Sequence, residues 1–175
     1  MKPQYLLIAF LVGFISLVYE IYSLKIIFFY FTESTHAISI TLAAFLGGLA
    51  FSSLFFSGIA QKKSVAQKKN LLIGLQFFSA LYALFILRNN TLIPYLLDIG
   101  KDTLLHNPEL FVVFKFALIF MYLFIPAFLL GGAFPILNGL FQSNYENRYI
   151  DTGKVYFWDT IGAISGSLAA GFIII

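Results

Sequence analysis

The sequence predicts an all-α, polytopic membrane protein, and three observations lead to that prediction. Of the 175 residues, 60% are hydrophobic and only 11% are charged, which is too few polar side chains to cover a soluble domain. The apolar residues come in runs of about twenty, the length with which an α-helix crosses a hydrocarbon layer of about 30 Å. The lysines gather in short polar segments between these runs, a distribution typical of membrane topology.

We expect a single integral-membrane domain, 1–175, with about five transmembrane helices and the N-terminus inside. The predicted spans are residues 5–31, 36–60, 71–87, 110–135 and 155–175. Because the connection after the first span is short, the first two spans should form an antiparallel hairpin, with Ser34 or Thr35 capping the second. The apolar segment 92–99 is interrupted by Pro94 and is too short to span, so we expect it to lie on the outer surface or re-enter slightly.

The fourth predicted span carries helix breakers near its inner end. Pro126, the pair Gly131-Gly132 and Pro135 lie close together in the sequence. A proline removes a backbone N–H from the helix, so the carbonyl group four residues earlier loses its usual donor. The sequence therefore predicts a kink or break here, tolerated if neighbouring helices satisfy the freed carbonyl groups.

The segment Gln61–Asn70 contains four lysines. The positive-inside rule predicts a cytoplasmic loop, and a lipid-headgroup or partner site is the alternative. The inner side then holds Lys2, Lys62, Lys63, Lys68, Lys69, Arg148 and Lys154, and the outer side holds Arg88 and Lys101. Because topology explains the formal charge of +3, we expect no nucleic-acid partner.

Small and polar residues recur at helical spacing in three predicted spans, where they favour close helix packing in lipid. The stripes are Gly13, Ser16, Glu20 and Ser23; Ala44, Gly48 and Ser52, beside Ala43 and Gly47; and Asp159, Gly162, Gly166 and Ala170. An ionised carboxylate is costly in lipid, so Glu20 and Asp159 should face the interior of the bundle.

The candidate substrate-binding or buried polar residues are Glu20, Asp159, Lys115 and Tyr19. Glu20 lies roughly 22 Å and Asp159 about 6 Å from the inner surface, so the two acids are too far apart to share a proton. Lys115 enters from the outer side at about the depth of Glu20, and we expect these two residues to pair across the first and fourth spans. Alternatively, Glu20 is protonated and hydrogen-bonded to a serine, or it lines a substrate cavity.

Other chemistry finds little support in the sequence. The chain contains no cysteine, which excludes disulfides, thiolate nucleophiles and zinc–thiolate sites. Its two histidines, His36 and His106, lack assigned carboxylate partners and are a weak metal signal. No Gly-rich phosphate loop, nucleophile elbow or metalloprotease helix is present. We therefore expect no catalytic residue, no metal and no cofactor in this chain.

Five segments form an ordered set of small-residue and polar motifs. They are Leu17–Leu24, Ser34-Thr35, Leu42–Ser53, Gly131–Leu137 and Tyr156–Gly171. In this order and spacing they resemble the membrane portion of bacterial spermidine synthase-like proteins. The matching positions are Tyr19, Glu20, Ser34, Thr35, Gly47, Pro135, Thr160 and Gly162. The chain departs from the family at Asp159, where the family tends to have Asn, and at Ser52, where it tends to have Gly.

In that family the spans precede a cytoplasmic aminopropyltransferase-type domain with a Rossmann-like fold. The resemblance therefore implies a module in the bacterial inner membrane that anchors or serves such a domain, which lies outside this chain. The apolar ending Gly171–Ile175 leads us to expect further spans or a soluble domain beyond it or on a separate chain. Two other hypotheses stay open: a transporter-like carrier of a cationic solute that binds through Glu20 and Asp159, and a structural subunit of a larger membrane complex. The expected partners are the lipid bilayer and other membrane helices or a cytoplasmic transferase domain.

Overall fold

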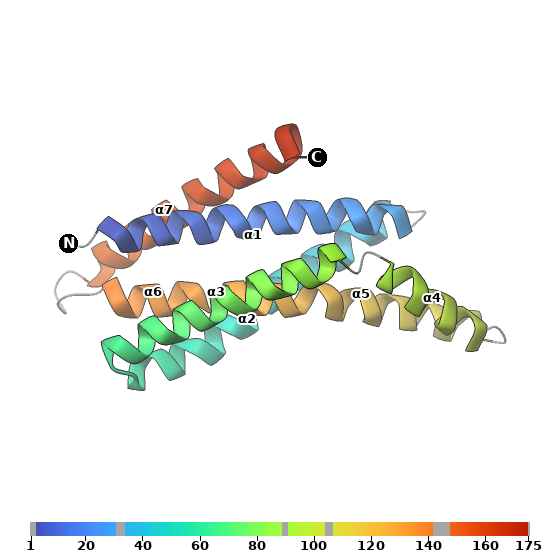
Figure 1. Cartoon of the computed structure of the whole chain (residues 1–175), viewed down its shortest axis with the longest axis horizontal. Coiled ribbons are helices and arrows are strands. Elements are labelled where there is room, and N and C mark those ends of the chain that lie inside the picture. Colours follow the sequence, from blue (N-terminus) through green and yellow to red (C-terminus); the bar gives the residue numbers. More distant parts are fainter. Residues whose placement is uncertain (1–2, 31–33, 89–90, 104–106, 142–147, 175) are drawn as a thin grey trace.

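The computed structural model describes residues 3–30, 34–88, 91–103, 107–141 and 148–174, and the regular elements in these ranges are all helical (Figure 1). They are α1 (Pro3–Tyr30), α2 (Ser34–Lys62), α3 (Val65–Arg88), α4 (Leu92–Thr103), α5 (Pro108–Gly131), α6 (Ala133–Phe141), α7 (Arg148–Ala169) and a π-helical turn (Ala170–Ile174). Four apolar helical stretches are long enough to cross a membrane: Pro3–Phe28, Ile38–Lys62, Val65–Arg88 and Pro108–Phe141. This confirms the predicted all-α polytopic fold. The fifth predicted span lies in the 22-residue helix α7, which is not among these four.

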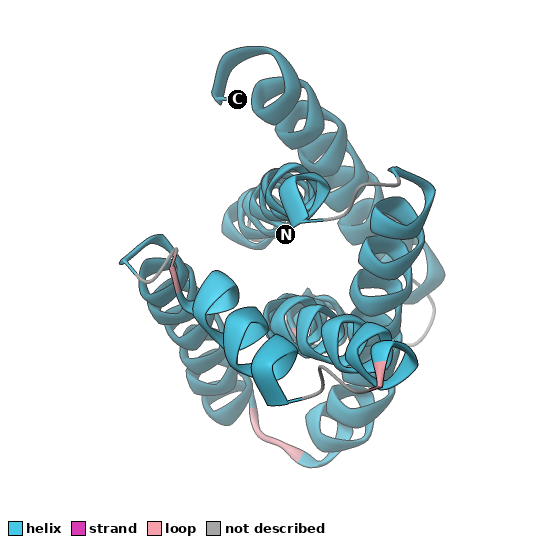
Figure 2. Ribbon diagram, turned by 90° about the vertical axis from the view of Figure 1, so that its right-hand side faces the viewer, coloured by secondary structure: helices cyan, strands magenta, loops and turns pink. Residues whose placement is uncertain are grey.

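The helices pack as two close pairs rather than as hairpins of sequence neighbours. Helix α1 packs most extensively on α7, and α2 packs most extensively on α5. Helix α3 lies against α5 and α6, and α4 contacts α5 (Figures 1 and 2). Although α1 and α2 are consecutive and touch each other, their largest interfaces are with other helices. The predicted hairpin is therefore a minor contact in the bundle.

The α1–α7 interface is built on glycines. A Cβ atom placed on Gly162 would overlap the carbonyl group of Phe10, and one placed on Gly166 would overlap that of Phe14. Gly13 meets the backbone of Asp159 in the same way. Residue numbers rise together along both helices, so α1 and α7 run parallel. Small residues let two backbones approach this closely in lipid, which confirms Gly13, Gly162 and Gly166 of the predicted stripes as packing positions.

The α2–α5 interface uses the second predicted stripe. Ala44 is fully buried, and a Cβ on Gly48 would lie 2.7 Å from the Cβ of Ala127 and 2.9 Å from the carbonyl oxygen of Phe124. Ser52 is fully buried and follows on the same face. The neighbouring positions behave differently: Ala43 is exposed, and Gly47 has no atom within 4 Å of its Cβ position. The contact face is therefore narrower than predicted.

The predicted ten-residue loop between the second and third spans is a tight turn. Helix α2 continues to Lys62 and α3 already begins at Val65. A capping box fixes the start of α3: the backbone N–H of Ser64 donates to Oε1 of Gln67 (3.1 Å), and the backbone N–H of Gln67 donates to Oγ of Ser64 (3.4 Å). The lysines predicted in a loop thus lie at or beside helix ends.

Three further boundaries differ from the prediction. Helix α2 begins at Ser34, so Thr35 lies inside the helix rather than before it. Segment 92–99 is part of the longer helix α4, which extends to Thr103. Helix α7 begins seven residues before the predicted Val155. His106, Phe31, the segment 142–147 and Ile175 lie outside the described residues, and so do the predictions made on them.

Candidate functional site

Helices α5 and α6 are separated by a break, and side chains from neighbouring helices donate hydrogen bonds to carbonyl groups on both sides of it. Helix α5 contains Pro126 and ends at Gly131, Gly132 forms a turn, and α6 follows from Ala133. The predicted break is therefore confirmed. Gly132 keeps a right-handed helical backbone, with φ −66° and ψ −19°, so the chain changes its hydrogen bonding here without reversing direction.

The carbonyl group freed by Pro126 receives a hydrogen bond from a neighbouring helix. In an uninterrupted helix the N–H of residue 126 would donate to the carbonyl oxygen of Tyr122, and proline has no N–H to give. The hydroxyl group of Tyr82 on α3 donates to this oxygen at 3.0 Å. The two tyrosine rings also contact, with centroids 6.4 Å apart. Tyr82 thus satisfies a backbone acceptor that lipid cannot satisfy.

A second carbonyl group at the break is satisfied in the same way. The N–H of Gly132, four residues after Phe128, is directed to the carbonyl oxygen of Leu130. The carbonyl oxygen of Phe128 instead accepts a hydrogen bond from Oγ of Ser52 on α2. Gly48, one turn earlier, lets α2 approach α5 closely enough for this contact. The α2 stripe therefore serves close packing and hydrogen bonding together.

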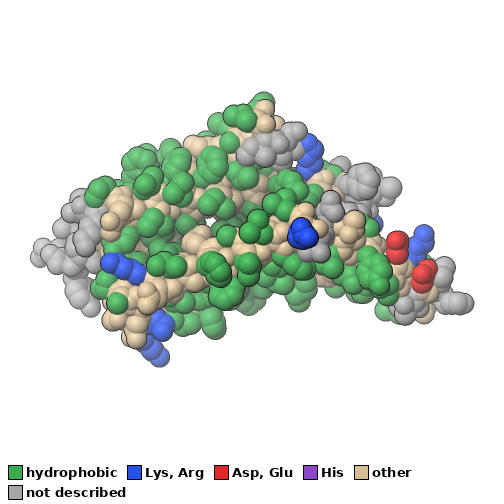
Figure 3. All heavy atoms as spheres, in the orientation of Figure 1, with side chains coloured by type: hydrophobic (Ala, Val, Ile, Leu, Met, Phe, Trp, Pro, Cys, Tyr) green, Lys and Arg blue, Asp and Glu red, His purple; other side chains and the backbone are tan. Residues whose placement is uncertain are grey.

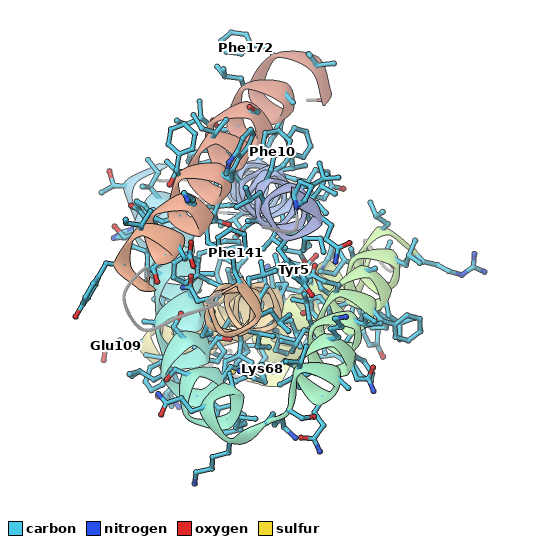
Figure 4. All side chains as sticks on the ribbon, turned by 90° about the vertical axis from the view of Figure 1, so that its left-hand side faces the viewer. Tyr5, Phe10, Lys68, Glu109, Phe141 and Phe172 are labelled. Atoms are coloured by element: carbon cyan, nitrogen blue, oxygen red, sulfur yellow. The ribbon has the colours of Figure 1, made fainter. Side chains whose placement is uncertain are left out.

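The end of α6 is held by a lysine. Nζ of Lys68 on α3 donates to the carbonyl oxygen of Gly139 at 3.1 Å, in the last turn of α6. Figure 4 shows Lys68 in the space between α2, α3 and α6. A cation at a helix C-terminus is favourable because the exposed carbonyl groups carry partial negative charge. Lys68 thus has a structural contact that the positive-inside rule does not predict.

Of the two acidic candidates, Glu20 lies on α1 and Asp159 on α7, and they do not form a joint site. Glu20 and Asp159 are half-buried. Within the described part of the chain the ion pair is between Lys154 and Asp151, at 3.9 Å, and involves neither acid. Gly13 lies on the backbone of Asp159, and Glu20 follows Gly13 by about 10 Å along α1. The two acids are therefore separated along the helix axis.

The structure shows no ion pair between Glu20 and Lys115 within the described residues, and both side chains are half-buried. Helices α1 and α5 run antiparallel (Figure 1) and share a buried cluster that includes Ile27 and Ile119. The two helices therefore pack together through apolar side chains, and the expected ion pair is not part of that contact.

Tyr19 points to another side of α1 from Glu20, because consecutive helical residues project about 100° apart. Its hydroxyl group is buried and makes no hydrogen bond within the described residues. Its phenol lies within electrostatic range of those of Tyr22, Tyr82 and Tyr122. Tyr19 therefore belongs to a tyrosine cluster shared by α1, α3 and α5. This cluster includes Tyr82, whose hydroxyl group donates to the carbonyl oxygen of Tyr122.

No metal centre is found among the residues that the structure describes, since they contain no group of three His, Cys, Asp or Glu side chains placed to hold an ion. The ring of His36 packs edge-on against Phe116, with centroids 6.0 Å apart. The candidate site is thus a set of half-buried acids and phenols around helix contacts, without a catalytic cluster in these ranges.

Sequence reasoning missed Tyr82, Lys68 and the donor role of Ser52. The position of Pro126 in the sequence predicts that the carbonyl group of Tyr122 needs another hydrogen-bond donor. It does not predict which residue donates, since that depends on which helix packs beside α5. Comparison of the chain with protein-family models, with curated proteins and with solved structures finds no match.

Proposed function

We propose that the protein is an integral-membrane module that anchors or serves an aminopropyltransferase-type partner or domain on the cytoplasmic side of a bacterial inner membrane. The motifs that resemble spermidine synthase-like membrane portions support this proposal. The described chain also consists of membrane-type helices around a packed centre, as an anchor requires.

One observation carries the proposal: the motif segments contain the residues that make the two closest helix pairs. Gly162 packs on α1, and Gly48 packs on α5. Gly131 lies against Leu49, where its Cβ would come within 2.8 Å of the Cα atom. A motif set that specifies helix contacts in this order favours a common membrane architecture over chance similarity of small-residue helices.

The proposal is tested by membrane-associated aminopropyl transfer in the cells that naturally make the protein. Membranes from cells with and without the gene are supplied with a diamine and an aminopropyl donor. We expect transfer activity to leave the membrane fraction when the gene is deleted and to return with the wild-type chain. Gly162→Leu should fail to restore it, and Gly153→Leu, at a position with open space around it, should restore it. Unchanged membrane activity after deletion would overturn the proposal.

A second candidate function is a carrier of a small cationic solute, and the placement of Glu20 favours it. This half-buried carboxyl group on a spanning helix makes no ion pair with the described residues, and ionisable groups at such positions commonly mark solute pathways. The test measures the uptake of a labelled diamine into proteoliposomes that contain the purified protein. Glu20→Gln should reduce uptake at least tenfold at equal protein content, whereas Glu109→Gln, at an exposed position of α5, should not. Uptake no faster than that of protein-free vesicles excludes this function.

A further inference from the structure

The turn between α2 and α3 concentrates positive charge at one end of the bundle. Lys62 ends α2, Lys63 lies in the turn and Lys69 lies near the start of α3. Lys62 and Lys69 are exposed, and Lys63 is half-buried. Figure 3 shows lysine side chains standing out at the end of the molecule where these two helices meet. Because the turn is tight, all three lysines lie at one end of the bundle, between the last turn of α2 and the beginning of α3.

The fourth lysine, Lys68, and the backbone N–H groups at the start of α3 already have hydrogen-bond partners within the chain. Nζ of Lys68 donates to the carbonyl oxygen of Gly139, so Lys68 points into the bundle. Ser64 and Gln67 satisfy each other's backbone N–H groups in the capping box. Whatever binds at this turn therefore meets Lys62, Lys63 and Lys69 rather than Lys68 or a bare helix terminus.

Apolar side chains surround the turn on its exterior. Val65 at the start of α3 is 58% exposed and Ile73, two turns further along, is 65% exposed. Leu54 and Phe55 on α2 are 75% and 58% exposed. On membrane-type helices we expect such side chains to face acyl chains and the lysines beside them to reach the headgroup layer. This favours a lipid over a soluble protein as the group that meets them.

Among the residues that the structure describes, no carboxyl group forms an ion pair with Lys62, Lys63 or Lys69. Residues 61–75 contain no Asp or Glu. Asp151, in the first turn of α7, is buried and lies 3.9 Å from Lys154. Each exposed lysine near an anionic surface strengthens binding by about fivefold at physiological salt, so two or three of them give a preference well above that of an isolated lysine.

We propose that Lys62, Lys63 and Lys69 form a binding site for the phosphate headgroup of an anionic phospholipid. The headgroup lies against the ammonium groups, and its acyl chains run along the exposed apolar side chains of α2 and α3. The inference does not depend on the proposed function, because it concerns the lipid environment of the chain rather than a substrate or partner.

The test uses the full chain in nanodiscs or detergent, with bound phosphatidylglycerol counted by native mass spectrometry. Lys62→Gln with Lys69→Gln should weaken phosphatidylglycerol binding about 25-fold, following the fivefold effect per lysine. The matched control, Arg88→Gln with Lys101→Gln, removes the same charge from exposed positions and should change binding less than twofold. Size-exclusion profiles and far-UV circular dichroism confirm that both variants fold.

Three outcomes would overturn the proposal. Equal losses in the two double variants would show that net charge alone attracts the lipid. Equal binding of phosphatidylcholine would show that the headgroup charge plays no part. Displacement of phosphatidylglycerol by millimolar inorganic phosphate would show a site for free anions instead of a lipid. Retention of binding after Lys68→Gln is expected, because Lys68 is engaged with Gly139.

Discussion

The hydroxyl group of Tyr82 on α3 donates a 3.0 Å hydrogen bond to the carbonyl oxygen of Tyr122 on α5, four residues before Pro126. The acceptor is the one that the proline leaves without a backbone donor. Oγ of Ser52 on α2 donates a hydrogen bond to the carbonyl oxygen of Phe128, and Nζ of Lys68 on α3 donates one to the carbonyl oxygen of Gly139. Neighbouring helices thus satisfy these three carbonyl groups of α5 and α6, which helps to make the break compatible with a lipid environment.

Replacement of Tyr82 by Phe should destabilise the fold by about 1 kcal/mol, the size typical of hydrogen bonds between membrane helices. The phenyl ring keeps the packing against Tyr122, so the loss reports the hydrogen bond. Unfolding of the purified chain by SDS in mixed micelles, followed by circular dichroism, measures the change. Tyr95→Phe, at an exposed position of α4, should have no effect, and an equal loss in both variants would contradict the assignment.

Replacement of Ser52 by Ala should cost a similar amount, about 1 kcal/mol, because the carbonyl oxygen of Phe128 then loses its donor at a fully buried position. Ser57 is the matched control: its Oγ donates to Leu54 in its own helix, so Ser57→Ala should be close to neutral. The same SDS titration compares the two. A neutral Ser52→Ala would mean that Phe128 does not need this donor.

Replacement of Gly162 by Ala should destabilise the α1–α7 pair by about 1–3 kcal/mol, the range for overpacking a close contact. The added methyl group meets the backbone of Phe10, which cannot rotate away as a side chain could. Gly153→Ala lies on the same helix in open space and should be neutral or stabilising, since alanine favours helix over glycine. Equal effects of the two substitutions on the SDS midpoint would show that α7 does not pack here.

Replacement of Lys68 by Met should lower stability by about 0.5–1 kcal/mol, because the last turn of α6 loses a cation beside its carbonyl groups. Lys69→Met, at an exposed position, should change stability by less. Thermal unfolding in detergent, followed by circular dichroism, compares the variants at low salt. A larger loss of stability for Lys69→Met than for Lys68→Met would show that the contact of Lys68 with Gly139 does not stabilise the fold.

The sequence predicted the four long apolar helices and part of their contact stripes, because both depend on local periodicity. Runs of apolar residues mark Pro3–Phe28 and Pro108–Phe141, and glycines at helical spacing mark the faces that meet. The break at Gly132 followed from proline and glycine chemistry within a single segment. These features need no knowledge of which helix is the neighbour.

The partners of each face could not be predicted. Helix α1 packs mainly on α7 instead of α2. The sequence did not predict this partner, because one small-residue stripe can pack on any other and the order of the helices in the chain does not choose between them. The expected pairing of Glu20 with Lys115 rested on counting residues from the membrane surface, and such a count does not determine how the side chains of two helices are turned toward each other. The α2–α3 connection was predicted as a loop from its four lysines, and the Ser64–Gln67 capping box that starts α3 there was missed.

A double-mutant cycle between Tyr82 and Pro126 separates the capping hydrogen bond from every other effect of the two residues. Unfolding free energies are measured for the wild type, Tyr82→Phe, Pro126→Ala and the double variant. Alanine restores the backbone N–H that Tyr122 lacks, so Tyr82→Phe should cost about 1 kcal/mol beside Pro126 and close to nothing after Pro126→Ala. The same cost in both backgrounds would contradict the conclusion that α3 satisfies the carbonyl group freed by the proline.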